Sequence, residues 1–440
     1  MNIGMIGLGY VGLVSAVGFA ELGHTVCCYD VDSRKTDMLL RGQAPIFEKG
    51  LQEKLDNGSL SDRIIVDSDM SRLVSDSEVI FIAVGTPSQA DGSANTEYVK
   101  AAVAGIINYL VEDGGTTHKV IVIKSTIPVG LTDKMQQVAD ERLRDLPHIR
   151  VDFGFCPEFL REGSALDDFS NPERIVIGCG SQDALLKIKS VFRRFIERGV
   201  PVVCTNCVSA EIVKYASNIM LATKIALLNE IADYADLVGG RIADVSLATG
   251  LDSRIGSRFL DASLGFGGSC FPKDVRAFSY FTKEKGFELP IAQSIMYSNE
   301  KHMGRQVEKI RSIAAELGGR SVLVLGTAFK ANTDDVRESP AIKIIRGLLS
   351  HGFDVTVTDP QALENTKAIL NDSVKYVERP EDAIDSVDLV VLCTEWGEYR
   401  SFDFCSRRDK MKGNVIIDLR NILDRGQLEE VGFVYYGIAN

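Results

Sequence analysis

Short apolar runs alternate with amphipathic stretches over the first part of the chain. Residues 3–6, 25–29, 79–84 and 119–124 form brief apolar or β-branched runs, which are typical of buried strands, whereas residues 14–22 carry small and apolar side chains at helical spacing. Strands that alternate with helices build a parallel sheet covered on both faces. The pattern therefore predicts a doubly wound α/β domain in this part of the chain.

The middle of the chain has helical patterning and little β signal. One long helix is predicted over residues 209–237, with Ser209 as its N-cap and Gly239-Gly240 as its stop. Further helices are predicted over residues 242–248, 274–285 and 292–317.

The last part of the chain repeats the first. Residues 321–326 correspond to 2–7, 354–359 to 25–30, 386–394 to 76–86, and 414–420 to 119–126. The predicted fold class is therefore α/β, with two Rossmann-like doubly wound domains joined by a central helical region. The expected boundaries are residues 1–203, 204–305 and 306–440. Because Thr327-Ala328-Phe329-Lys330 brings no glycine triad after Gly326, only the first domain is expected to bind a dinucleotide.

Composition and charge narrow the function classes. The 440 residues allow about two to four domains, and contents of 45% hydrophobic and 25% charged residues exclude a disordered or fibrous chain. The 49 Lys+Arg against 61 Asp+Glu give a net charge of −12, without the basic excess that a nucleic-acid binder needs. An anionic ligand must therefore be held by a few local cations.

Neither a membrane span nor a signal peptide is expected. The sequence has no run of about 18 or more apolar residues. It opens directly into the apolar residues 3–6, without a charged leader region or a cleavage site. Nine cysteines without secretory context indicate reduced thiols and a cytoplasmic location.

A glycine turn follows the first predicted strand. Gly7 permits the tight turn, Gly9 lets the backbone approach a pyrophosphate, and Gly12 allows close packing of helix against strand. The next strand ends in Asp30, whose carboxylate can accept hydrogen bonds from a ribose and repel a 2′-phosphate. This favours NAD over NADP, although Arg34 and Lys35 nearby keep NADP open as an alternative.

A second candidate is the glycine-rich block 265–274 around Cys270. The glycines allow a ligand to approach the backbone closely, and the Lys273 ammonium would raise the thiolate fraction of a cysteine nucleophile. Asp274 could then act as a base or orient a water molecule. From these residues alone, a buried structural cysteine beside a salt-bridged surface turn is an equal alternative.

Polar residues elsewhere give weaker signals. Lys214 and Asn218 share one face of the long helix and could stabilise an oxyanion, but a surface lysine beside a surface asparagine is the simpler interpretation of such a pair. Glu158 and Glu162 follow a predicted strand, where open α/β sheets bind ligands, or they are solvated charges that open a helix. Cys204 and Cys207 have no second pair at zinc spacing, so no metal site is predicted.

Taken together, these motifs resemble the nucleotide-sugar 6-dehydrogenases, the UDP-glucose/GDP-mannose dehydrogenase family. The resemblance runs through the glycine turn, Gly85-Thr86-Pro87, Ser125-Thr126, residues 157–162, Lys214 with Asn218, Arg254-Ile255-Gly256, residues 265–274, Phe329-Lys330 and Arg337-Glu338-Ser339-Pro340. It implies an NAD-binding domain, a central helical dimerisation region and a C-terminal nucleotide-sugar domain. It also implies a homodimer or larger oligomer.

The resemblance further implies four-electron oxidation of a nucleotide sugar by NAD through a cysteine thiohemiacetal and thioester. Cys270 would be the nucleophile, Lys214 and Asn218 would stabilise oxyanions, and Asp274, Glu158 and Thr126 would manage protons and the hydrolytic water. The implied NAD-binding residues are Gly7, Gly9, Tyr10, Val11, Gly12, Asp30, Lys35, Thr86, Thr126, Glu162, Lys273 and Arg337.

The implied substrate-binding residues come from all three parts of the chain. They are Glu158, Phe159, Leu160, Arg161, Glu162, Lys214, Asn218, Arg254, Phe259, Leu260, Asp261, Ala262, Ser263, Gly267, Lys330 and Arg420, with Arg254 reaching across the dimer. Lys330, Arg420 and Arg254 would gather around the diphosphate, which is how an acidic protein would hold this anion.

Several alternatives stay open. Residues 254–260 and Thr394-Glu395-Trp396 favour the UDP-glucose branch over the GDP-mannose branch, but Asp418-Leu419-Arg420 and Glu48-Lys49-Gly50 depart from the family pattern. The first departure leaves the recognition of the base less secure. A two-electron β-hydroxyacid dehydrogenase would need neither Cys270 nor a third domain. A non-catalytic NAD sensor would not need Cys270, Lys214 and Asp274 intact.

Overall fold

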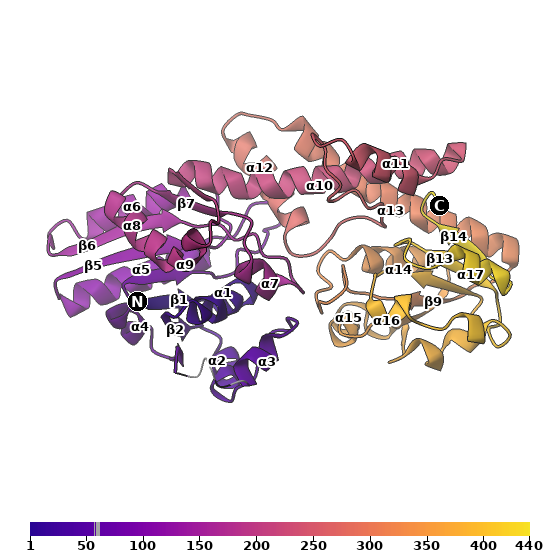
Figure 1. The fold of residues 1–440 in the computed structure, drawn as a ribbon, viewed down its shortest axis with the longest axis horizontal. Coiled ribbons are helices and arrows are strands. Elements are labelled where there is room, and N and C mark those ends of the chain that lie inside the picture. Colours follow the sequence, from indigo (N-terminus) through magenta and orange to yellow (C-terminus); the bar gives the residue numbers. More distant parts are fainter. Residues whose placement is uncertain (57, 59–61) are drawn as a thin grey trace. The chain divides into compact units, whose positions relative to one another are not determined.

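The computed structural model describes residues 1–56, 58 and 62–440. The chain divides into two compact units, one made of residues 1–217 and 280–285 and the other of residues 218–279 and 286–440. Each unit contains a mostly or wholly parallel sheet with helices around it (Figure 1). The predicted class, two Rossmann-like domains with a long helix in the central region, is confirmed. The three-domain boundaries stay a prediction.

The first unit is built on one sheet with the strand order β3-β2-β1-β4-β5-β6-β7-β8. The strands are β1 (Asn2–Ile6), β2 (Thr25–Tyr29), β3 (Ile64–Val66), β4 (Val79–Ile82), β5 (Thr117–Ile123), β6 (Ile149–Phe155), β7 (Ile175–Cys179) and β8 (Val202–Thr205). Neighbouring strands are parallel except β6 and β7. The order 3-2-1-4-5 from the edge is that of a dinucleotide-binding sheet.

Helices cover both faces of this sheet. They are α1 (Tyr10–Glu21), α2 (Ser33–Leu40), α3 (Leu51–Asp56), α4 (Met70–Asp76), α5 (Glu97–Asp113), α6 (Leu131–Arg142), α7 (Ala165–Ser170), α8 (Gln182–Val191) and α9 (Arg193–Glu197). Phe81 packs in the core that contains α1 and α7, whereas its neighbours Ile80 and Ile82 pack in the core that contains α5 and α6. Because successive side chains on a strand point to opposite faces, nearly every position of β4 is buried.

The second unit contains a sheet with the order β11-β10-β9-β12-β13-β14, all parallel. The strands are β9 (Ser321–Leu325), β10 (Asp354–Thr358), β11 (Lys375–Tyr376), β12 (Leu389–Leu392), β13 (Val415–Asp418) and β14 (Val434–Gly437). The associated helices are α14 (Pro340–Ser350), α15 (Leu363–Leu370), α16 (Gly397–Arg400) and α17 (Arg425–Glu430). Short 3-10 helices lie at Asn371–Ser373, Pro380–Asp382, Ile384–Ser386 and Cys405–Arg407.

The central region consists of α10 (Cys207–Val238), α11 (Ile242–Gly250), α12 (Phe271–Glu284) and α13 (Pro290–Leu317). Helix α10 is unbroken and begins in the first unit and continues in the second (Figure 1). The predicted Ser209 N-cap is wrong, because the helix begins two residues earlier and the Asn206 side chain accepts the Ser209 N–H at 2.7 Å. None of the helices within the described residues is long and apolar enough to cross a membrane.

The two sheets share one turn geometry after their first strand. In the first unit, the Gly7 N–H donates to the Tyr29 carbonyl at 2.8 Å, and Asp30 Oδ2 accepts the Leu8 N–H at 2.6 Å. In the second, the Gly326 N–H donates to the Thr358 carbonyl at 2.9 Å, and Asp359 Oδ2 accepts the Thr327 N–H at 2.7 Å. We call this arrangement the turn brace. The sequence repeat between the two ends of the chain is therefore a structural repeat.

Candidate active site

The glycine turn lies between β1 and α1. A Cβ added at Gly12 would lie 1.8 Å from the Gly7 carbonyl oxygen, so only glycine fits there. A Cβ added at Gly9 would meet nothing within 4 Å, which leaves the backbone open to a ligand. Gly9 is the N-cap of α1 and makes no side-chain cap, so the first N–H groups of the helix suit an anionic pyrophosphate. This local geometry fits a dinucleotide.

Asp30 stands beside this turn with Lys35. Its Oδ2 accepts the Leu8 N–H and lies 3.2 Å from Lys35 Nζ, while its Oδ1 accepts the Asp32 N–H at 2.9 Å. A carboxylate offers about four acceptor positions, so these three donors leave capacity for a ribose hydroxyl. Asp30 thus combines a structural contact with a position suited to the ribose.

Thr86 and Thr126 lie where β4 and β5 end. The Thr86 hydroxyl donates to the Thr126 carbonyl at 2.8 Å, and the Ser125 hydroxyl donates to the Val84 carbonyl at 2.7 Å. The carboxyl ends of parallel strands are the ligand-binding edge of such sheets. Both predicted threonines therefore lie at the edge where a dinucleotide would bind.

Glu158 and Lys214 form a buried ion pair. Lys214 Nζ lies 2.6 Å from Glu158 Oε1 and also donates to the Glu158 carbonyl at 2.8 Å. Burial alone would raise the pKa of Glu158, but the Lys214 ammonium and the Leu160 N–H outweigh it and hold that pKa below its usual value. The interpretation of Lys214 as a surface lysine is wrong, because its side chain is only 5% exposed.

The rest of the segment from Glu158 to Glu162 is firmly held. The Phe159 ring lies under the Arg174 guanidinium at 3.7 Å. Arg161 is turned to the surface and forms an ion pair with Asp168 at 2.6 Å. Glu48, which the sequence analysis treated only as a departure from a pattern, accepts the N–H groups of Gly163 and Ala165 at 2.7 and 2.8 Å. The segment is thus positioned by buried charges on both sides.

In the second unit, Asn218 and Asp274 meet below Cys270. Asn218 Nδ2 donates to Asp274 Oδ2 at 2.6 Å, and Lys273 Nζ lies 2.5 Å from Asp274 Oδ1. Asp274 is 1% exposed and Asn218 is buried, so the interpretation of both residues as surface groups is wrong. Lys214 lies one helical turn before Asn218 on α10, which places both on one side of the helix.

Cys270 immediately precedes α12 and is half-buried. Its carbonyl accepts the Asp274 N–H at 2.8 Å, which closes the first turn of the helix. The N-terminus of a helix stabilises negative charge, so this position favours a thiolate. The preceding glycines are tightly packed, since a Cβ at Gly267 would lie 2.3 Å from the Glu338 carbonyl oxygen. The backbone that leads to Cys270 is therefore tightly packed, and Cys270 itself is partly exposed.

Two predicted substrate cations follow the ends of β9 and β13. Arg420 donates to the carbonyls of Cys393 and Phe329 at 2.8 and 2.9 Å and lies 3.2 Å from Glu395. Lys330 is half-buried, with its Nζ 5.6 Å from the centre of the Phe329 ring. Both thus occupy the carboxyl edge of the second sheet, where an anionic ligand would be expected.

The other predicted residues of the second unit differ in exposure. Arg254 is 87% exposed and pairs with Asp252, and Arg337 pairs with Asp335 at 2.7 Å. Phe259 adopts a positive φ of 62°, which only a held loop sustains in a bulky residue. Leu260 and Ala262 are buried, Ser263 is half-buried and Asp261 is exposed.

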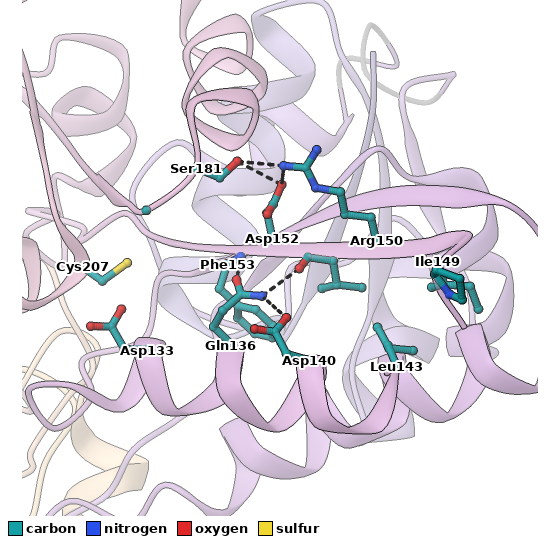
Figure 2. A pocket seen from close by; sticks show the side chains of 13 residues that line it. Asp133, Gln136, Asp140, Leu143, Ile149, Arg150, Asp152, Phe153, Ser181 and Cys207 are labelled. Carbon is teal, nitrogen blue, oxygen red and sulfur yellow. Dashed lines mark hydrogen bonds and ion pairs between the residues drawn. The ribbon is translucent and has the colours of Figure 1, made fainter. Parts of the chain in front are cut away.

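A cavity of about 560 Å³ in the first unit is lined by other residues. Its lining comes mainly from α6 and from residues 149–153 of β6 (Figure 2). The predicted residues Glu158 and Glu162 come after the C-terminal end of that strand. Arg150 pairs there with Asp152 at 2.9 Å, and Gln136 donates to Asp140 at 2.9 Å. Cys207 lies at the margin of the cavity. Burial is the main cause that raises the pKa of its thiol to about 12, and the negative charges of Asp133 and Glu211 add to this effect. None of the described residues lining this cavity belongs to the predicted site.

Comparison with known proteins identifies the family. Residues 1–196 match the NAD binding domain of the UDP-glucose/GDP-mannose dehydrogenase family, residues 208–301 its central domain and residues 323–425 its UDP binding domain. The chain is 40% identical over 442 aligned residues to a UDP-glucose 6-dehydrogenase of Rickettsia typhi, with 100% of both chains covered. The chain belongs to the UDP-glucose/GDP-mannose dehydrogenase family.

Two further relatives agree with this assignment. The UDP-glucose 6-dehydrogenase TuaD of Bacillus subtilis is 39% identical, covering 100% of this chain and 93% of the relative. A solved UDP-glucose dehydrogenase of Pyrobaculum islandicum has a TM-score of 0.88 at 39% identity, covering 100% of this chain and 97% of that one. This member of the dehydrogenase family is an NAD-dependent oxidoreductase, as the sequence predicted.

Some residues that hold this dehydrogenase's site in place were not predicted from the sequence. Glu211 accepts the N–H groups of Gly130 and Thr132 and the Thr132 hydroxyl, and so ties the segment after Thr126 to α10. Its signal was present, because Glu211, Lys214 and Asn218 recur at helical spacing in a largely apolar helix. The roles of the individual site residues stay predictions.

Proposed function

We propose that the protein oxidises UDP-glucose to UDP-glucuronate, with two NAD reduced per sugar at one active site. The observation that carries the proposal is the partly exposed Cys270 at the start of α12, one helical turn before an Asp274 carboxylate fixed by Asn218 and Lys273. A dehydrogenase that stopped at the aldehyde would not need a thiol. The identity of the sugar nucleotide rests on the relatives that bear this name.

The overall reaction converts a primary alcohol, two NAD⁺ and one water into a carboxylate, two NADH and three protons. When bound, NAD accepts a hydride in each of the two oxidations. In the first, the sugar hydroxyl gives its proton to a base, for which we propose Asp274 acting with Thr126 and Glu158 through water. The product of this step is an aldehyde that stays bound.

The second oxidation requires a tetrahedral centre at the aldehyde carbon. The Cys270 thiolate adds to that carbon, and the resulting alkoxide of the thiohemiacetal is stabilised by the Lys214 ammonium and the Asn218 amide. Loss of a hydride from this centre leaves a thioester on Cys270. A water molecule, deprotonated by Asp274, then attacks the thioester, which releases the carboxylate and regenerates the thiolate.

Recognition of the substrate divides between the diphosphate and the sugar. Lys330, Arg420 and, from a second copy of the chain, Arg254 would hold the diphosphate. A guanidinium that pairs with backbone carbonyls or with a partly exposed carboxylate, as Arg420 and Arg254 do, can be redirected to a phosphate. The segment from Glu158 to Glu162 and the loop from Phe259 to Ser263 would hold the sugar. Arg337, Lys273 and Glu162 would contact NAD.

A homodimer is part of the proposal. Helix α10 exposes Met220, Leu227, Ile231, Tyr234 and Val238, whose side chains are 38–70% accessible. Their spacing of seven and three or four residues places them in one stripe, which a second copy of the helix would cover. Light scattering of Leu227→Glu should show a monomer.

A cytoplasmic location also belongs to the proposal, supported by nine cysteines that are all free thiols.

The test is the number of NADH formed per sugar consumed. UDP-glucose, UDP-N-acetylhexosamines and GDP-mannose are each offered with NAD, and the products are separated. We expect two NADH per UDP-glucose and slower turnover of the others. Cys270→Ser should stall, and its mass spectrum should show the sugar nucleotide held as an oxygen ester on the substituted side chain. Cys270→Ala should lose the covalent step. One NADH per sugar with free aldehyde, or full activity of Cys270→Ala, would refute the mechanism.

A further inference from the structure

We propose that Asn299 and His302 on α13 are positioning residues that hold two different loops, one governing the reaction of Cys270 and the other governing substrate affinity. This inference rests on the proposed function, in which Cys270 is the nucleophile and residues 259–263 contact the sugar. The two side chains lie three residues apart, so they project from one side of the helix. Each makes its contacts within the second unit.

Asn299 pairs with the backbone that leads into the cysteine loop. Its Oδ1 accepts the Phe266 N–H at 3.0 Å and its Nδ2 donates to the Phe266 carbonyl at 2.9 Å. The side chain is 1% exposed, so losing either bond would leave a buried polar group of Phe266 unsatisfied. Gly265 approaches so closely that a Cβ there would lie 2.8 Å from Asn299 Oδ1. Asn299 thus fixes the peptide four residues before Cys270.

His302 holds the end of the other loop. Its Nε2 lies 2.7 Å from the Ser263 carbonyl and its Nδ1 lies 2.8 Å from Asp233 Oδ1. Both partners are hydrogen-bond acceptors, so the ring is held from both sides. Asn229 of α10 accepts the Ser263 N–H at 2.9 Å from the other side. The peptide of Ser263 is therefore clamped between α10 and α13.

The two anchors divide one continuous segment. Ser263 ends the loop that begins at Phe259, whereas Phe266 begins the rigid glycine turn that presents Cys270. Removing the His302 anchor at Ser263 frees the predicted sugar contacts without moving the thiol. Removing the Asn299 anchor at Phe266 lets the thiol deviate from its reacting position. A displacement of about 1 Å at a reacting group can cost roughly 100-fold in rate, so the loss of the Asn299 anchor should appear in kcat.

The experiment compares Asn299→Leu and His302→Phe, which keep volume and remove the polar groups. We expect Asn299→Leu to lower kcat and the rate of Cys270 alkylation by iodoacetamide about tenfold, with the KM for UDP-glucose within about twofold. His302→Phe should raise that KM about tenfold and leave the alkylation rate unchanged. The conservative variants Asn299→Gln and His302→Gln keep an amide that can donate to the same backbone carbonyl, and they should recover part of the loss.

His351→Gln and Asn365→Asp serve as matched controls, because both side chains are exposed and lie on the same unit. Neither should change kcat, KM or alkylation. Amide hydrogen exchange and alkylation need no sugar, so they test the anchors even if UDP-glucose is not the substrate. Exchange should rise near Phe266 in Asn299→Leu and near Ser263 in His302→Phe. The inference would be overturned if Asn299→Leu and His302→Phe had equal effects on kcat and KM, or if amide hydrogen exchange did not change in either variant. If these two apolar variants do not fold, the conservative variants are compared in the same way.

Discussion

The buried ion pair between Glu158 and Lys214 supports a quantitative prediction. Lys214→Met replaces the ammonium by an apolar chain and leaves the Glu158 carboxyl, whose side chain is 7% exposed, without its cation. Removing one partner of a buried pair costs about 3–5 kcal/mol. For a domain of about 200 residues each kcal/mol lowers the melting temperature by about 2–4 °C, so a decrease of roughly 6–20 °C is expected.

The pH dependence gives the same reasoning a second test. The pKa of Glu158 is lower in the folded protein than its usual value of 4.5, because Lys214 and the Leu160 N–H outweigh the opposing effect of burial. A carboxyl with a depressed folded pKa adds stability above its unfolded pKa and loses it as the pH falls through the folded value. The difference between wild type and Lys214→Met should therefore be full at neutral pH and shrink in acid.

Thermal unfolding followed by circular dichroism measures both effects. The matched control is Lys100→Met, which breaks a pair with Glu97 whose side chains are 47% and 73% exposed. Such a pair is worth less than about 1 kcal/mol. The double variant Lys214→Met with Glu158→Gln should recover part of the lost stability, because no charge is left buried. A melting temperature of Lys214→Met equal to that of Lys100→Met would refute the argument.

Three further changes have defined outcomes. Gly12→Ala should abolish NAD binding in calorimetry, because a Cβ would lie 1.8 Å from the Gly7 carbonyl oxygen; retained affinity would show that the turn relaxes. Asp30→Ala should lower kcat/KM for NAD and narrow the gap to NADP, and a wild-type protein that prefers NADP would contradict the assignment. Lys330→Ala and Arg420→Ala should each raise the KM for the nucleotide sugar, because each loses a charged hydrogen bond that contributes about 1.5–3 kcal/mol to binding. An unchanged KM in both variants would place the diphosphate elsewhere.

Local signals in the sequence predicted much of the fold. Strand β2 has its predicted bounds, and α13 ends one residue before Gly318, whose φ of 67° suits a helix stop. The start of α10 was missed by two residues, because Asn206 and Ser209 are both good capping residues and tertiary packing decides between them. Turn and capping chemistry thus defines where an element ends only when one candidate stands alone.

The candidate site was less accessible to such reasoning. The partner of Lys214 is 56 residues away in the sequence, so nothing local shows that the lysine is buried. Asn299 and His302 read as polar positions of an amphipathic helix, yet both are buried because loops cover that side of α13. A polar residue on a helix predicts a solvent-exposed face unless another segment of the chain covers it. Whether such a segment is present depends on the tertiary fold.

The turn brace has a consequence for engineering cofactor preference. Asp359 supports its turn in a domain without a glycine triad, where both of its oxygens accept backbone N–H groups. The carboxylate of the turn brace, present as Asp30 and as Asp359, therefore serves first to hold the turn. At Asp30 it has the recognition of a ribose as a second role. Replacing Asp30 by alanine removes both at once, whereas Asp30→Asn keeps an acceptor for the Leu8 N–H. A redesign toward NADP should begin from the asparagine, since it removes the negative charge and keeps the hydrogen bond from the Leu8 N–H, although it gives up the one from the Asp32 N–H.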